Sequence, residues 1–131
     1  GAKQDLAKAF GLLKKACEGK QYRGCFYMGS LHDGLKGLDG HGLEKEPGKA
    51  YEAYRTACSG GVGEACYNVG QMLDAGRVVD GKDKKLHARV AKFFGLACAQ
   101  SVGRGCANLG AMKYEGTQIR QDHKGALQLF R

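Results

Sequence analysis

Apolar residues recur at intervals of three and four positions in several stretches of the chain, which is the pattern of helices with one buried face. Leu6, Phe10 and Leu13 follow this rule in the first stretch, and Tyr51 and Tyr54 follow it in a later one. The pattern predicts an all-α chain. The aromatic residues at such positions are expected to form the core: Phe10, Tyr51, Tyr54, Phe93, Phe94 and Phe130.

Capping residues and glycines give approximate helix boundaries. Longer helices are predicted over about 5–17, 47–59 and 84–99, with Asp5 as an N-cap and Pro47 in a first turn. Shorter helices are predicted to start near positions 23, 63 and 103. Each short helix is expected to end at a C-cap glycine: Gly34, Gly76 and Gly116. A further helix is predicted to start near Asp122.

Six cysteines carry the strongest signal in the chain. They form three C-x7-C pairs, and their first members are separated by 41 and then 40 residues: Cys17, Cys25, Cys58, Cys66, Cys98 and Cys106. Small residues recur around them, namely Ala16, Ala57 and Ala97, then Gly24, Ala65 and Gly105, then Gly29, Gly70 and Gly110. A fixed period of this length indicates a repeat protein.

Two helices per period predict an α-solenoid of antiparallel helix-pair repeats, similar to tetratricopeptide arrays, with about 3.5 repeats. We expect one repeat domain over residues 1–131. Its units would be a half repeat at about 5–22, full repeats at 23–59 and 63–99, and a truncated repeat at 103–131. We also expect the native chain to begin before Gly1 and to continue beyond Arg131.

The cysteine pairs are predicted to be disulfides that clip each helix corner. A helix would end at the first cysteine, a turn of about six residues would follow, and the next helix would open at the second. Local pairing (17–25, 58–66 and 98–106) is favoured because any other pairing needs three different long-range geometries. Zinc ligation, a redox-active pair and free buried thiols remain alternatives, although C-x-x-C and recurring histidines are absent from the sequence.

Composition narrows the class of protein. The chain is 43% hydrophobic and 26% charged, so we expect a globular fold without a transmembrane segment. Its net charge of +8 favours an acidic protein partner or an anionic surface. Nucleic-acid binding is not expected, because the basic run at 82–92 lacks interleaved aromatic residues.

The repeats resemble the Sel-one-like repeat family, a relative of tetratricopeptide repeats. The resemblance rests on the K-A runs (Lys8-Ala9 and Lys49-Ala50), on the A-C that closes the longer helices, and on the L-G or V-G followed by D-G, A-G or E-G. It covers essentially the whole chain. The cysteine-bearing branch of this family includes Hcp-type bacterial proteins and a mitochondrial cytochrome c oxidase assembly factor.

What the resemblance implies about function is a non-catalytic scaffold for protein–protein interaction. The extended loops at 34–47 and 76–88 look more like the mitochondrial assembly factor. They favour a role in respiratory-complex assembly in the intermembrane space, with a periplasmic or secreted protein as the alternative. Paired cysteines point to an oxidising compartment in either case.

Bacterial members are also labelled as β-lactam hydrolases, and a thiol oxidoreductase is a further alternative. The serines lack the S-x-x-K pattern of a penicillin-recognising enzyme. His32 and His41 with Asp33 and Asp39 form the one local histidine cluster, and they are expected to be solvated in a loop. We therefore expect no catalytic residue, no metal and no cofactor.

A binding surface is expected where the first helix of each pair lines the concave face. The candidates follow each second cysteine: Tyr27, Asn68, Gln71, Asn108 and Met112. An asparagine amide offers both a donor and an acceptor to the backbone of an extended peptide. The alternative is that Asn68 and Asn108 satisfy the helix-end carbonyls of a neighbouring repeat.

Overall fold

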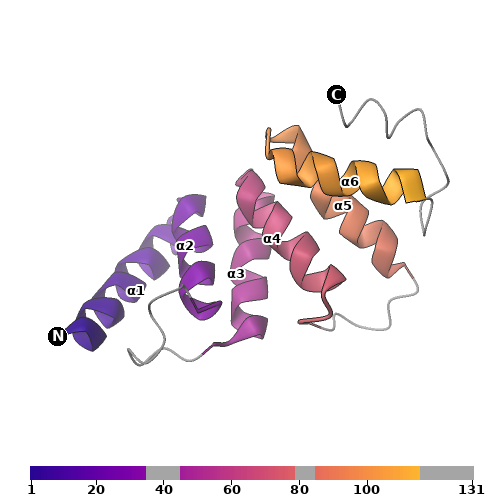
Figure 1. Cartoon of the computed structure of the whole chain (residues 1–131). Helices are drawn as coiled ribbons and strands as arrows, with labels where there is room; N and C mark the ends of the chain where they lie inside the picture. The colour runs from indigo at the N-terminus through magenta and orange to yellow at the C-terminus, as the bar shows by residue number, and fades with distance from the viewer. Residues whose placement is uncertain (35–44, 79–84, 116–131) are drawn as a thin grey trace. The chain divides into compact units, whose positions relative to one another are not determined.

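The structure is a computed structural model that describes residues 1–34, 45–78 and 85–115. Within these residues the chain contains helices and no strand (Figure 1). The helices are α1 (Ala2–Glu18), α2 (Tyr22–His32), α3 (Pro47–Ser59), α4 (Gly63–Asp74), α5 (Leu86–Ala99) and α6 (Gly103–Glu115). The helix predicted near Asp122 lies outside the described residues, as do Gly116 and Phe130.

The chain divides into two compact units, Gly1–Val62 and Gly63–Arg131. In the first unit α2 packs against both α1 and α3, and in the second unit α5 packs against both α4 and α6. Most predicted helices are confirmed within a few residues. Asp5 is not an N-cap, because α1 begins at Ala2 and places Asp5 in its first turn. Pro47 does occupy the first turn of α3.

The corners after α1, α3 and α5 are three residues long, so the expectation of about six residues was wrong. The middle residue of each corner is left-handed: Lys20 (φ 67°), Gly61 (φ 93°) and Ser101 (φ 67°). The next backbone N–H reaches back to the alanine before the first cysteine, with donors Gln21, Val62 and Val102 and N–O distances of 2.8, 3.0 and 3.0 Å. This is the Schellman ending, which needs little chain to reverse direction.

Disulfides fasten these short corners. Cys17 bonds to Cys25 and Cys98 bonds to Cys106, with Cα–Cα distances of 4.7 and 4.6 Å. Cys58 and Cys66 are disulfide-bonded as well. The small residue before the second cysteine permits this approach, because a Cβ at Gly105 would lie 2.8 Å from the Cβ of Ala97.

The recurring glycine four residues after the second cysteine has a packing reason. A Cβ at Gly29 would lie 2.8 Å from the Tyr54 ring, and a Cβ at Gly70 would lie 2.8 Å from the Phe94 ring. Each glycine therefore lets the aromatic residue of the following helix lie directly on the backbone. Such a close fit is the reason for glycine inside a helix, where it otherwise costs stability.

The core consists of small and aromatic residues at the helix contacts. Of the predicted aromatic core, Tyr51, Tyr54, Phe93 and Phe94 are buried. Phe10 is only partly buried, and it borders a hollow in the first unit. The predicted C-cap glycines Gly34 and Gly76 do end their helices, with φ values of 74° and 69°.

Candidate functional site

A groove lies in the second unit, where α4 and α6 flank the buried ring of Phe94 from α5. It consists of two hollows of about 220 and 230 Å³ that share Asp74, Phe94 and Asn108 as lining residues. We call it the α4–α6 groove. Its lining is Gln71, Asp74, Ala75, Arg77, Phe94, Asn108, Ala111, Met112 and Glu115.

The floor of the groove is held by aromatic packing. Phe94 is 2% exposed, and its ring lies 5.7 Å from the ring of Tyr67 on α4. The guanidinium of Arg104 covers the Tyr67 ring at 4.5 Å, which is a cation–π contact. The side-chain amide of Gln71 donates a 2.7 Å hydrogen bond to the Tyr67 hydroxyl. Gln71 therefore has a fixed position at the edge of the groove.

The charged edge of the groove comes from helix ends. Asp74 is the last residue of α4, and Glu115 is the last residue of α6. After Asp74 the chain turns at once, because Gly76 is left-handed and the N–H of Arg77 bonds to the carbonyl of Met72 at 3.0 Å. Asp74 and Glu115 are both exposed. The groove thus combines an apolar floor, a polar centre and carboxylates at its rim, with the guanidinium of Arg77 lining one of its two hollows.

The structure brings three of the five predicted binding residues together. Gln71, Asn108 and Met112 line the α4–α6 groove. Asn68 is partly buried on α4 and is not a lining residue of either hollow. Tyr27 is 48% exposed on α2 in the first unit, with its ring edge-on to Phe26. A binding role for these residues stays a prediction.

Sequence reasoning missed the carboxylates and the aromatic floor. Asp74 comes just before the A-G pair and Glu115 is the first residue of the E-G pair, and the sequence pattern indicates only helix ends at these positions. Phe94 was assigned to the core, which is correct, yet it is also the floor of the groove. The sequence does contain one signal for the carboxylates: an acidic residue lies near the C-terminal end of each short helix.

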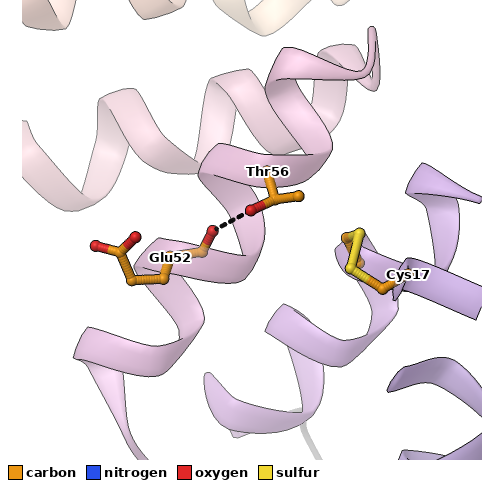
Figure 2. Close-up of a disulfide and its surroundings, with 4 residues drawn as sticks. Cys17, Glu52 and Thr56 are labelled. Atoms are coloured by element: carbon orange, nitrogen blue, oxygen red, sulfur yellow. Dashed lines mark hydrogen bonds between the residues drawn. A yellow bond between two sulfur atoms is a disulfide. The ribbon is translucent and has the colours of Figure 1, made fainter. Parts of the chain in front are cut away.

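A larger hollow of about 540 Å³ lies in the first unit, between α1 and α3, with α2 at its base. Its lining is Phe10, Lys14, Cys17, Glu18, Met28, His32, Gly48, Lys49, Glu52, Ala53 and Thr56. Figure 2 shows Thr56 on the side of α3 that faces the Cys17 disulfide, with its hydroxyl donating to the Glu52 carbonyl at 3.0 Å. The charges around this hollow are mixed.

His32 lines this hollow and has a lowered pKa. Its Nδ1 lies 3.3 Å from Oε2 of Glu46, and its ring meets Phe10 edge-on at 5.0 Å between centroids. Burial lowers the pKa of His32 below its usual 6.5; nearby Lys49 adds to this effect and Glu46 opposes it. The imidazole is therefore neutral at pH 7.

Cysteines and potential metal ligands are fully accounted for only in the described residues. These residues contain no free cysteine and no group of three or more metal-ligating side chains. His41 and Asp39 of the sequence cluster lie outside the described residues, while Asp33 accepts a hydrogen bond from the Tyr54 hydroxyl at 3.4 Å. No helix in the described part of the chain is long and apolar enough to cross a membrane.

Solved structures resemble this chain over almost its whole length. A protective antigen of uropathogenic Escherichia coli with an SLR fold matches at a TM-score of 0.77 and 23% identity, covering 95% of this chain. The match spans 25% of that larger protein. A Sel1 repeat protein from Oxalobacter formigenes matches at a TM-score of 0.74 and 22% identity, covering 97% of this chain and 86% of that one.

A cysteine-rich protein is also among the similar solved structures. Helicobacter pylori cysteine rich protein B matches at a TM-score of 0.65 and 25% identity, covering 99% of this chain and 86% of that one. A search of curated protein sequences found no significant match. These structures confirm the all-α solenoid, and the bridges confirm its disulfide staples. They agree with an oxidising compartment, where such bridges persist.

The sequence itself matches a repeat family along most of its length. The Sel1 repeat matches at residues 1–20, 23–62, 63–86 and 103–131. These segments contain both cysteines of the Cys17–Cys25 bridge and both flanking helices of the α4–α6 groove, whereas most of α5, with Cys98, lies between two matches. The chain belongs to the Sel1 repeat family.

Proposed function

We propose that this chain is a protein-interaction scaffold, and that its α4–α6 groove binds an extended segment of a partner protein. Sel1 repeat proteins generally act as scaffolds of this kind. The observation that supports the groove is the convergence of Gln71, Asn108 and Met112 around the Phe94 floor. These residues come from two different helices, so their proximity is a product of the fold.

The chemistry of the groove suits a peptide. Asn108 lines both hollows, and its amide has a donor and an acceptor to offer to a backbone. Phe94 and Met112 supply an apolar surface beside it, and thioether side chains adapt to varied partners. Hollows of about 220 and 230 Å³ are smaller than the usual ligand cavity of roughly 300–1,000 Å³, which favours single side chains of a peptide over a free small molecule.

Net charge supports an acidic partner at long range. A charge of +8 attracts an acidic protein during diffusion, and this attraction raises the association rate more than the final affinity. Assembly of a respiratory complex in the intermembrane space stays a prediction from the sequence. Disulfides also form and persist in the periplasm and outside the cell.

The proposal is tested by affinity capture from the native oxidising compartment, with wild-type chain and a groove variant compared side by side. Asn108→Ala with Met112→Ala removes the amide and the thioether from the partly buried edge of the groove. A partner that uses the groove is expected to be retained by the wild-type chain and lost by the variant. Gln100→Ala is the matched control, because Gln100 is exposed at the end of α5 and outside the groove.

Two results bear directly on the proposal. A partner lost from the groove variant and kept by the control supports it, provided that circular dichroism shows both variants folded. A partner that binds all three chains equally contradicts the use of the groove. If the partner kept by the wild-type chain is a respiratory-complex subunit, the assembly role gains its first direct support.

A further inference from the structure

The hollow nearer the end of α6 has a composition that selects one kind of side chain. Its lining is Asp74, Phe94, Asn108, Ala111, Met112 and Glu115. Its charged members are two carboxylates, and no cation is among the described residues that line it. This local charge is opposite in sign to the net charge of the chain. Long-range attraction and local recognition therefore favour different features of a partner.

The positions of the two carboxylates strengthen this preference. Asp74 is the last residue of α4, and the C-terminus of a helix carries partial negative charge from its aligned peptide dipoles. The end of α4 and the Glu115 carboxylate thus add to the same negative potential at one hollow. Both side chains are exposed, so a cation reaches them without losing all of its water.

The floor of the hollow is apolar. Phe94 is buried, and Ala111 and Met112 are partly exposed beside it. A lysine or arginine side chain fits an apolar floor with a charged rim, because its methylene stem packs on apolar surface while its charged head stays near water. The Asn108 amide stands between floor and rim, where it can bind the backbone that carries such a side chain.

We propose that this hollow recognises a lysine or arginine side chain of the partner segment, with the stem over Met112 and Ala111 and the head between Asp74 and Glu115. The inference rests on the proposed peptide-binding function of the α4–α6 groove. It adds that an acidic partner presents a cationic residue at this point. The first unit's hollow supports no such choice, because lysines and glutamates both line it.

The test uses the full 131-residue chain and four blocked peptides that differ at one central position: lysine, arginine, norleucine or glutamate. Binding is followed by NMR through the side-chain amide signals of Asn108 and Gln71, which lie in the groove. At low ionic strength the lysine and arginine peptides are expected to bind about tenfold more tightly than the norleucine peptide, with about threefold from each exposed carboxylate. The glutamate peptide is expected to bind most weakly.

Neutral variants assign the preference to the two carboxylates. Asp74→Asn and Glu115→Gln are each expected to reduce the lysine-over-norleucine ratio about threefold, and together they are expected to abolish it. Glu64→Gln is the matched control, since Glu64 is an exposed carboxylate in the first turn of the same α4. Raising the salt to about 0.5 M is expected to weaken the preference in the wild-type chain, because the head group is exposed.

The outcomes separate this inference from the proposed function. If the norleucine or glutamate peptide shifts the Asn108 amide as strongly as the lysine peptide does, peptide binding stands and the cationic preference is wrong. A preference that survives in the double variant likewise overturns the role of Asp74 and Glu115. If none of the four peptides shifts either amide, both the inference and the groove as a peptide site are contradicted.

Discussion

The two units use the same scaffold and place their hollows on different helices. In the first unit the hollow lies between α1 and α3, the helices that carry the first cysteine of each pair. In the second unit the groove lies between α4 and α6, which carry the second cysteine. The difference teaches that the repeated residues determine the corner and the packing, whereas the unrepeated residues determine what each surface can bind.

The repeated part is closely alike in the two units. Gly29 against Tyr54 in the first unit corresponds to Gly70 against Phe94 in the second. The corner hydrogen bonds and the bridges also correspond. The hollows differ in size, about 540 Å³ against about 220 and 230 Å³, and in charge. Three experiments test how far this likeness extends.

The largest expected effect comes from removing the bridges. Cys17→Ala with Cys25→Ala, and separately Cys98→Ala with Cys106→Ala, should each lower the free energy of unfolding by about 2–3 kcal/mol, because both bridges span a sequence separation of 8. The first pair should lose somewhat more, since Cys25 is fully buried and Cys106 is not. Urea denaturation followed by circular dichroism measures both. A negligible loss in either unit would contradict a stabilising role for that bridge.

A smaller effect is expected from adding one methyl group at the helix contacts. Gly29→Ala and Gly70→Ala should each destabilise the chain by about 1–3 kcal/mol, because the new Cβ would overlap a buried ring. Gly11→Ala is the matched control: Gly11 lies inside α1 with nothing within 4 Å of its Cβ position. This control should gain up to about 1 kcal/mol from helix propensity. Equal responses from all three variants would mean that the contact is not tight.

The smallest effect is a pH dependence confined to the first unit. The pKa of His32 is lowered in the folded chain, so the unfolded chain takes up the proton first as the pH falls below about 6.5. Stability should therefore be fully present above that pH and decrease through the interval down to the folded pKa. His32→Gln should flatten this part of the profile of melting temperature against pH, whereas His87→Gln, at an exposed position on α5, should not. A steeper profile for His32→Gln would show that another group dominates.

The sequence predicts the helix hairpins well because their determinants are local and periodic. Cysteine spacing, the alanine before it and the glycine after it all recur at one period, and each has a contact that explains it. The length of the corner was misjudged because Lys20 and Ser101 adopt a left-handed conformation that is uncommon for residues with side chains. Glycine at position 61 shows the preference of the corner directly.

The candidate site was only partly predictable for a physical reason. Asn108 and Met112 could be chosen from their register on one helix, but the floor that joins them comes from α5. Asp74 and Glu115 could not be predicted as a pair, because the sequence of one helix does not show which other helix lies beside it. The spacing of hydrophobic residues likewise did not predict the hollow between α1 and α3, which depends on Phe10 remaining partly exposed.

The short span of each bridge has a consequence for biogenesis. The two thiols of these corners are separated by 8 positions, and the partner of each is the nearest sulfur along the chain. Each of these hairpins can therefore be oxidised without waiting for distant segments of the chain to arrive. A chain built in this way has little need for an isomerase to correct wrong pairs, because the correct pair is also the one that collides most often.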